Sequence, residues 1–369
     1  MIRTAEFERL QRQRLQELSE ARAAGKKVIG YWCQYVPAEL IHASGAIPVR
    51  LLRASREAEE RGEKYLRSDA CSFCKVCLGG FETESLYRFV DGVVNVSTCD
   101  MMRRLGEAVS AFAGVPAFTL YLPRTSEPLS PRVGEFLRQL RLLADWLACF
   151  TGVRAESTRL ADAITSYDRL RELLRKFDAN RALPAPAVSQ SDILDLTALA
   201  VTLDPDQATA LLERLLSLLP TASAGMTVRP RLLLAGSIFL PADRWFLNVL
   251  EAGADVVGDV LCTGARWSAE TQVGRGDSLE SLAWFYYSRP ACACRRPNDE
   301  LYQFARQLIA ERGVQGIVVK TLLYCDPWSF EIRRLRQKLR IPVLAVDSDY
   351  AGENQEQVRT RIEAFLEAL

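Results

Sequence analysis

The stretch Gly92-Val93-Val94-Asn95-Val96-Ser97-Thr98-Cys99-Asp100 decides how the rest of the chain is interpreted. Its β-branched run predicts a buried strand, and a cysteine and an aspartate follow at the carboxyl end. In parallel α/β sheets ligands bind at that end, because the loops after the strands form the crevice. The same pattern returns as Gly316-Ile317-Val318-Val319-Lys320-Thr321-Leu322-Leu323-Tyr324-Cys325-Asp326. We therefore expect one site built from two halves of the chain.

Strands and helices alternate around both Cys-Asp pairs, which predicts parallel, doubly wound α/β sheets. The first Rossmann-like domain is predicted over residues 26–128 and the second over residues 229–369, which closes on a helix at 355–369. We predict strands of the first domain at 28–32, 46–51, 91–97 and 116–121. We predict strands of the second at 232–236, 254–257, 316–324 and 341–346.

The two predicted domains share a local motif. Cys33-Gln34-Tyr35-Val36-Pro37-Ala38-Glu39 aligns with Ser237-Ile238-Phe239-Leu240-Pro241-Ala242-Asp243, and both precede a predicted helix. Two tandem copies of one α/β unit explain this internal repeat economically, and their facing carboxyl edges would form a shared cleft.

Helical segments precede and separate the two domains. Residues 1–25 contain an amphipathic helix at 4–24, and residues 129–228 are predicted to be a helical insert because leucines recur at helical spacing without a convincing strand. The helices of the insert are predicted at 133–150, 157–180 and 203–219.

The composition excludes several classes of protein. The chain has 369 residues, enough for two or three domains, and 47 basic residues balance 46 acidic ones. This balance gives no general nucleic-acid footprint, and glutamates interleave with the locally basic segment 50–61, which indicates a solvated helical surface. No apolar run is long enough to span a membrane, and the charged first helix lacks the core of a signal peptide. We expect a cytoplasmic protein that binds neither membrane nor nucleic acid.

Cysteine chemistry is the strongest functional signal. The chain has ten cysteines and a single histidine, His42. In a reducing compartment this inventory favours metal or redox chemistry over disulfides, with an iron–sulfur cluster first and a four-cysteine zinc site second. Cys33, Cys99 and Cys325 all follow predicted strands, where loops can turn a thiolate toward a metal.

The remaining cysteines carry weaker signals. Cys71, Cys74 and Cys77 form a Cys-x-x-Cys-x-x-Cys run on a predicted helix, and we expect at least one of them to bind the main cluster. Cys262 follows a predicted strand. Cys292 and Cys294 follow Pro290 in a predicted loop that could approach the cleft, and a bystander role is an equal alternative for this pair. Cys149, in a leucine-rich helix, is predicted to be core.

The sequence contains no recognisable phosphate-binding motif and no residue with a clear catalytic signature. Neither a Walker A loop nor a Gly-x-Gly-x-x-Gly strand–helix turn is present, and Gly274-Arg275-Gly276 is an isolated loop, so ATP hydrolysis by this chain is not expected. Glu39 and Asp100 are interpreted as carboxylates at helix N-termini with a dipole role, and no residue is assigned as catalytic. Polar groups expected near the cleft are Tyr35, Glu39, Asp100, Ser237 and Asp326.

A long match accompanies these signals. The segment from Cys33 through Leu51 resembles the opening motif of the 2-hydroxyacyl-CoA dehydratase / benzoyl-CoA reductase family. Cys71-Ser72-Phe73, Ser97-Thr98-Cys99-Asp100 and Tyr324-Cys325-Asp326 follow in the family's order, and 359–367 resembles its C-terminal signature. The resemblance covers essentially the whole chain.

The resemblance implies a [4Fe–4S] cluster held between two Rossmann-like domains. Its ligands would be Cys71, Cys99 and Cys325, with Cys33 at a position that varies in the family. Three thiolates would leave one iron open to substrate, as in a catalytic subunit, whereas four would suggest an electron-relay subunit.

The implied function is an oxygen-sensitive enzyme that reduces an acyl-CoA thioester by one electron. The dehydratases then expel the 2-hydroxyl group, whereas the reductases keep the electrons in an aromatic ring. The resemblance also implies a related partner subunit, or a homodimer, and a separate ATP-hydrolysing iron–sulfur activator. Two alternatives stay open: a double-cubane-cluster reductase of small molecules, to which Cys292 or Cys294 could contribute ligands, and a non-catalytic cluster or zinc electron-relay module.

Overall fold

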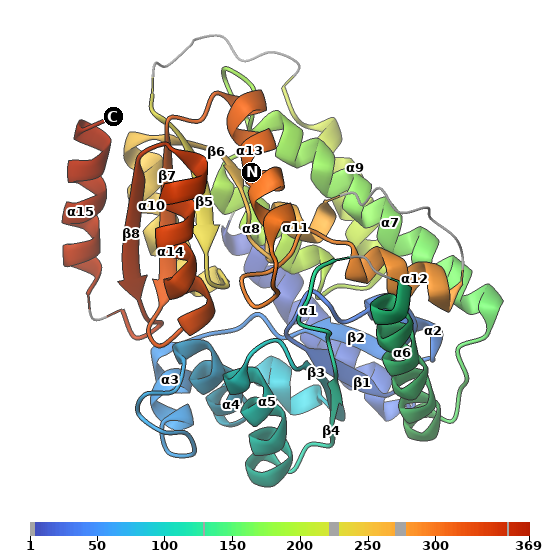
Figure 1. Ribbon diagram of the computed structural model, residues 1–369. Coiled ribbons are helices and arrows are strands. Elements are labelled where there is room, and N and C mark those ends of the chain that lie inside the picture. Colours follow the sequence, from blue (N-terminus) through green and yellow to red (C-terminus); the bar gives the residue numbers. More distant parts are fainter. Residues whose placement is uncertain (1–3, 128–129, 221–228, 270–277, 353) are drawn as a thin grey trace.

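The computed structural model describes residues 4–127, 130–220, 229–269, 278–352 and 354–369, and it contains two separate four-stranded parallel sheets (Figure 1). The first has the strand order β2-β1-β3-β4 and the second the order β6-β5-β7-β8. In both sheets the strands follow the same order, in which the second strand of the unit comes first, then the first, the third and the fourth. This is expected for two Rossmann-like units related by an internal repeat. The predicted α/β fold is confirmed.

The first sheet is built from short strands whose residues are mostly buried. Val28 pairs with Ile47, and Val93 with Ala117, in parallel register. Its strands are β1 (Val28–Tyr31), β2 (Ile47–Arg50), β3 (Gly92–Val96) and β4 (Ala117–Leu120). The helices of this half are α2 (Ala38–Ala43), α3 (Arg56–Gly62), α4 (Ser72–Thr83) and α5 (Asp100–Ala108), with a 3₁₀ turn at Ser85–Phe89 and a π-helical turn at Val109–Ala113.

Both faces of the second sheet are covered, which explains its nearly continuous apolar strands. Leu233 and Ala235 of β5 pack in the cluster that contains α13 and α14, whereas Leu232 and Leu234 face α10 and α15. Its strands are β5 (Arg231–Gly236), β6 (Asp255–Asp259), β7 (Gly316–Leu322) and β8 (Val343–Ser348). Its helices are α10 (Arg244–Gly253), α11 (Ala265–Ser268), α12 (Leu279–Tyr287), α13 (Asp299–Arg312), α14 (Asp326–Leu339) and α15 (Gln355–Glu367), with a 3₁₀ turn at Pro241–Asp243.

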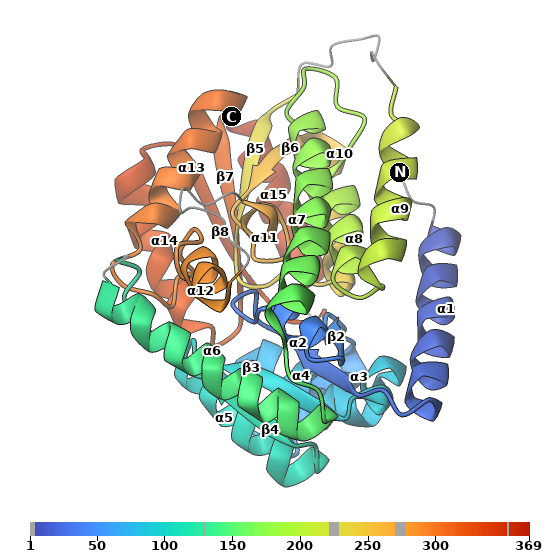
Figure 2. The ribbon, with the colours of Figure 1, turned by 90° about the vertical axis from the view of Figure 1, so that its right-hand side faces the viewer.

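Long helices connect the two halves. Figure 2 shows α7 running alongside both halves, with α8 and α9 beside it and α1 at the edge. Helix α6 packs against β4 and α12. The bounds are α1 (Thr4–Ala23), α6 (Ser130–Thr151), α7 (Ser157–Asn180), α8 (Gln190–Ala200) and α9 (Pro205–Ser217).

The predicted elements differ from the observed ones in two places. Helix α8 has no counterpart among the predicted elements. The helix that carries Cys74 and Cys77 is predicted over 71–90, but it ends at Thr83 and a 3₁₀ turn follows at Ser85–Phe89. The predicted solvated helical surface over 50–61 is correct for the Arg56–Glu60 and Arg61–Glu57 pairs of α3. It is wrong for Arg50, which ends β2, and for Glu59, which accepts the Tyr350 N–H bond, because both side chains are buried. The domain boundaries near 128 and 228, like Gly274-Arg275-Gly276, lie outside the described residues, and the division into domains stays a prediction.

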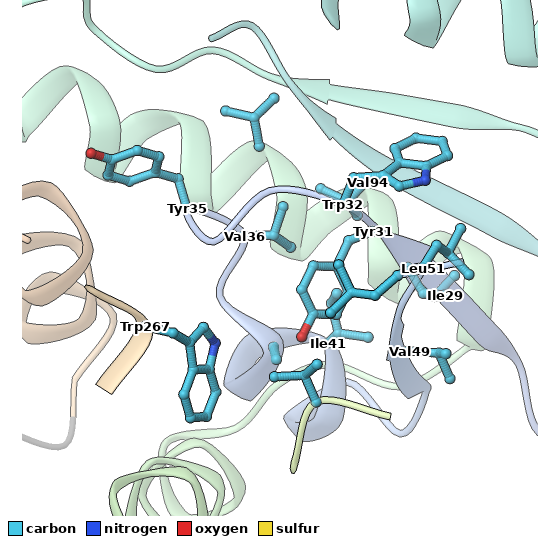
Figure 3. Packing of buried hydrophobic residues seen from close by; sticks show 14 of the residues in the cluster. Ile29, Tyr31, Trp32, Tyr35, Val36, Ile41, Val49, Leu51, Val94 and Trp267 are labelled. Carbon is cyan, nitrogen blue, oxygen red and sulfur yellow. The ribbon is translucent and has the colours of Figure 1, made fainter. Parts of the chain in front are cut away.

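Side chains from distant segments share one core. Figure 3 shows Tyr31 and Trp32 at the end of β1, Tyr35 and Val36 in the following loop, and Trp267 of α11 within one buried cluster. Trp267 belongs to the second half of the chain, so the loop after β1 is held between the two halves. Of the described helices, none is long and apolar enough to cross a membrane.

Candidate metal centre

Most of the cysteines line one cavity. It has a volume of about 120 Å³ and lies where the carboxyl ends of strands from both sheets face each other. Of the ten cysteines in the chain, eight contribute to its wall: Cys33, Cys71, Cys74, Cys99, Cys262, Cys292, Cys294 and Cys325. Both halves of the chain therefore contribute to one thiol-rich cavity, and metal binding there stays a prediction.

Three of these cysteines stand at the N-termini of helices. Cys71 is the N-cap of α4, Cys99 that of α5 and Cys325 that of α14. The Cys99 sulfur accepts a hydrogen bond from the backbone N–H of Met102 at 3.5 Å. Helix N-termini carry partial positive charge and free N–H groups. The three helices thus favour negative charge on these sulfurs.

The cysteines fall into two neighbouring groups. Cys71 interacts with both Cys74 and Cys325, which joins the α4 run to the second half of the chain. The second group surrounds the loop after α12, where the thiols of Cys292 and Cys294 contact each other. The backbone N–H of Cys292 donates to the Tyr35 hydroxyl at 3.2 Å. Cys33 and Cys262 belong to this second group, since Cys33 interacts electrostatically with Cys262 and with Cys292.

Cys99 lies between the two groups and interacts with Cys325 on one side and Cys292 on the other. The cavity therefore holds a continuous set of thiols rather than two isolated pairs. Across the described residues, no three histidine, cysteine, aspartate or glutamate side chains are gathered tightly enough to form a ready site for a single metal ion. The thiols share a cavity wall without converging on one point.

Hydrogen bonds between neighbouring thiols and burial determine the pKa of most of these cysteines. Desolvation raises the pKa of Cys33 to about 12. Cys292 is the exception, because its hydrogen bond with Cys294 and the adjacent Arg266 guanidinium lower its pKa well below the ordinary value despite desolvation. Metal ligation requires thiolates, so a metal that enters must displace the protons of most of these groups.

The rest of the wall is mostly apolar. Large apolar side chains and one charged side chain, that of Arg266, fill the space between the cysteines. Such surroundings strengthen electrostatic interactions within the site and influence the redox potential of a bound metal. The apolar members are Trp32, Phe73, Met102, Ile238, Leu322, Pro327 and Trp328.

All four cysteines predicted as ligands, Cys33, Cys71, Cys99 and Cys325, line the cavity. The predicted core position of Cys149 is wrong, because its side chain is exposed on α6. Its helix turns this position away from the leucine stripe that packs inward. The signals for Cys74, Cys262, Cys292 and Cys294 are weak in the sequence because only the fold brings the separate loops together.

The polar residues expected near the cleft fall into two groups, one at the cavity and one on the surface. Tyr35 and Ser237 line the cavity, and Ser237 Oγ accepts a hydrogen bond from the Leu322 N–H at 3.1 Å. Asp100 and Asp326 are exposed and line a surface groove instead. They point outward because each starts a helix whose preceding cysteine faces inward.

Glu39 has more than a dipole role. It lies in the first turn of α2, is fully buried, and forms an ion pair with Arg171. The Tyr286 hydroxyl donates to its second carboxylate oxygen at 2.7 Å. This group supports the centre of the molecule and does not line the cavity.

A family model described as 2-hydroxyglutaryl-CoA dehydratase, D-component, matches residues 33–369. The chain belongs to this family. The predicted resemblance to the 2-hydroxyacyl-CoA dehydratase / benzoyl-CoA reductase proteins is thereby confirmed. The match begins at Cys33, the first cysteine of the cavity, and includes every other one.

Three relatives of this member of the 2-hydroxyglutaryl-CoA dehydratase D-component family align with it over nearly their whole length. The Escherichia coli protein named "Putative dehydratase subunit YjiM" is 30% identical over 362 residues, covering 94% of this chain and 92% of the relative. The beta subunit of (R)-2-hydroxyglutaryl-CoA dehydratase from Acidaminococcus fermentans is 24% identical, covering 99% and 98%. One of the benzoyl-CoA reductase subunits of Thauera aromatica is 21% identical, covering 93% and 91%.

Proposed function

We propose that this protein is the iron–sulfur subunit of an acyl-CoA dehydratase or reductase, and that its cofactor is bound in the thiol-lined cavity. The observation that carries the proposal is the eight cysteines on one cavity wall. Relatives named as subunits of 2-hydroxyglutaryl-CoA dehydratase and benzoyl-CoA reductase support the reaction class.

The chain's own residues would hold the cofactor and keep water away from it. Cys71, Cys99 and Cys325 would ligate a [4Fe–4S] cluster from helix N-termini, with Cys33 as a fourth ligand from the loop after β1. When bound, such a cluster supplies single electrons at low potential. The apolar wall around Trp32 and Trp328 would exclude water from the site.

The electron acceptor proposed for this site is an acyl-CoA thioester. A partner subunit, or a second copy of this chain, and an ATP-hydrolysing iron–sulfur activator complete the proposed system. A partner is supported by the relatives, which are named as individual subunits of larger enzymes. A separate source of ATP-driven electrons is supported by the lack of phosphate-binding motifs in the sequence.

A double-cubane cluster is the second candidate, and a specific observation favours it. A single [4Fe–4S] cubane uses four cysteine ligands, whereas eight thiols line this cavity in two neighbouring groups. Cys33, Cys262, Cys292 and Cys294 would then hold a second cubane. Such a protein would reduce small molecules at the cavity.

Anaerobic purification followed by iron, sulfide and zinc analysis tests both candidates. A single cubane requires about four iron ions per chain and a double cubane about eight. Zinc at about one equivalent without iron would refute the iron–sulfur proposal and favour the zinc module.

A matched pair of variants assigns the ligands. Cys292→Ser would keep the full iron content if one cubane sits on Cys33, Cys71, Cys99 and Cys325, and would lower it if a second cubane is present. Cys149→Ser, at an exposed position, is the control and should keep all iron. The reaction type is then assayed with the iron-loaded protein, activator, ATP and reductant against 2-hydroxyacyl-CoA, aromatic acyl-CoA and small reducible molecules.

A further inference from the structure

Four arginines near the cavity are buried. The relative exposure of Arg50 is 0%, and that of Arg266, Arg289 and Arg295 is 1% each. Within the described parts of the chain, none of these four forms an ion pair. Arg181, buried to the same degree, pairs with both Asp178 and Asp259.

Two of these arginines contact the cysteine loops from the strand ends. Arg50, at the end of β2, donates to the backbone oxygens of Trp32 and Cys262, both at 2.9 Å. Arg266, in α11, lines the cavity itself, and its guanidinium lies against the Cys292 sulfur. It also donates to the carbonyl of Ala291 at 3.1 Å, next to Cys292 in the chain.

The other two approach from the segment that carries Cys292 and Cys294. Arg289 donates to the carbonyl of Gln34 at 3.2 Å, in the loop that carries Cys33. Arg295 follows Cys294 directly and donates to the carbonyls of Tyr287, at 2.7 Å, and Thr125, at 2.6 Å. Every one of the four therefore holds a backbone carbonyl in or beside a segment that builds the cavity wall.

The hydrogen bonds to backbone carbonyls do not use all of the guanidinium N–H groups, and they do not neutralise the positive charges. Among the described residues, Arg50 Nη2 and both Nε and Nη2 of Arg289 are buried and have no hydrogen-bond partner. Aromatic rings beside Arg289 and Arg295 offer cation–π contacts but no net negative charge. A buried charge without a counterion is strongly destabilising. Arg289 has the Glu39 carboxylate in its surroundings. For Arg50, Arg266 and Arg295 the natural counterion is the set of thiolates that they interact with, together with whatever metal group these thiolates bind.

We propose that Arg50, Arg266 and Arg295 form a cationic shell that balances the negative charge of the thiolate-bound cluster and raises its reduction potential. The inference rests on the proposed iron–sulfur function. Arg266 is the positioning residue with the largest effect, because it alone of the three lines the cavity. A positive charge close to a cluster stabilises the reduced, more negative state, so its removal makes the potential more negative.

Three variants test the shell: Arg266→Met removes the charge, Arg266→Lys keeps it, and Arg181→Met removes a buried charge that has its own carboxylates. Iron content and midpoint potential are measured anaerobically, with a redox titration followed by electron paramagnetic resonance. We expect Arg266→Met to shift the potential to more negative values, Arg266→Lys to restore most of the wild-type potential, and Arg181→Met to leave the potential of any iron-loaded protein unchanged.

An iron-loaded Arg266→Met protein with the wild-type potential would overturn the inference. If Arg266→Met binds no iron, the iron content of Arg266→Lys decides: iron retained with lysine supports a role for charge, and iron lost in both variants overturns it. Absence of iron from the wild-type protein would instead refute the proposed function. Arg50→Met provides an independent second variant, with the same expected direction and a smaller shift, because Arg50 does not line the cavity.

Discussion

At the scale of single residues, Glu39 shows how the centre of the molecule holds a charge. Burial raises the pKa of this carboxyl, but the Arg171 guanidinium and the Tyr286 hydroxyl together lower it by more. The net pKa therefore lies below its ordinary value. The charged form of Glu39 is therefore stabilised in the folded protein. Arg171 in turn lies over the ring of Phe285 at 4.5 Å.

This ion pair predicts an acid-sensitive contribution to stability. The pKa of Glu39 is lower in the folded state, so the contribution is fully present above the ordinary carboxyl pKa of 4.5 and is lost as the pH falls through the lowered folded value. Glu39→Gln should reduce the free energy of unfolding by about 3 kcal/mol at pH 7, the lower end of the cost of breaking a buried ion pair. The buried Arg171 then keeps only Asp168 as a carboxylate partner. Urea denaturation at pH 7 and at a series of pH values below 4.5 measures both effects.

The control is Asp100→Asn, which removes an exposed carboxylate paired with Arg104. It should change the free energy of unfolding by less than about 1 kcal/mol. A Glu39→Gln protein as stable as this control would contradict the role given to the buried pair.

Residue-scale prediction from sequence works where chemistry is local. A cysteine directly after a β-branched run is recognisable as a strand-end residue, which places Cys33, Cys99 and Cys325 correctly at the cavity. The arginines of the shell carry no such signal, because a buried arginine and an exposed one look alike in sequence. The prediction for Cys149 is wrong for a related reason, since the leucines around it do not reveal which side of α6 faces the core.

At the scale of elements, a substitution at a cysteine N-cap can distinguish the residue's contribution to folding stability from its contribution to metal binding. Serine is a preferred N-cap residue. Cys99→Ser should therefore keep the stability of the metal-free protein within about 1 kcal/mol of the wild type, since the serine oxygen can accept the Met102 N–H bond. The same variant should lose iron, because a hydroxyl is a poor ligand for an iron–sulfur cluster. Thermal unfolding and iron analysis are the two measurements.

A Cys99→Ser protein with full iron content would remove Cys99 from the ligand set. Cys325→Ser at the N-cap of α14 offers the matching test from the second half of the chain.

Helices α3 and α4 pack with their backbones in close contact, which fixes the position of the Cys71–Cys74 turn. A Cβ on Gly79 would lie 1.9 Å from the Ala58 carbonyl oxygen, and one on Gly62 would lie 2.0 Å from that of Lys75. Gly79→Ala should therefore force the helices apart and reduce the free energy of unfolding by about 1–3 kcal/mol. Chemical denaturation measures the loss.

Gly134→Ala in α6 is the matched control, because a Cβ there meets no atom within 4 Å. It should be neutral or stabilising by roughly 0.4–1 kcal/mol. Equal effects of the two substitutions would show that α3 and α4 are not in close contact.

Element prediction succeeds where one face of a helix or strand is apolar. Helix α7 has the predicted bounds because its leucines form a stripe. Helix α8 escapes prediction because it is buried on all sides, so that its polar and apolar residues show no helical period. Its capping box, formed by Ser189 and Asp192, is the available signal.

At the scale of the whole molecule, individual hydrogen bonds join the two halves near the cavity. The Ser72 N–H donates to the Leu323 carbonyl at 3.3 Å, and the Tyr350 N–H donates to Glu59 at 2.9 Å. Cys71 and Cys325 face each other across the same boundary. A metal group bound by both cysteines would link the halves far more strongly than these hydrogen bonds do.

Metal removal should therefore loosen the molecule along this boundary. We expect the iron-loaded protein to melt at a higher temperature than the metal-free protein, because ligands bind only when both halves are in place. Amide hydrogen exchange of the 71–75 and 322–326 segments should rise after chelation, while that of α7 stays unchanged. Equal melting temperatures and exchange in the two forms would contradict a cluster shared between the halves.

The cavity takes its thiols from a span that begins at Cys33 and ends at Cys325. At a synthesis rate of about 5–20 residues per second, the first of these is made on the order of fifteen seconds to a minute before the last. During that interval the earlier thiols have no complete site to enter. A cofactor that needs both halves can be inserted only after almost the entire chain has been translated, so its assembly competes in time with oxidation of the newly made cysteines.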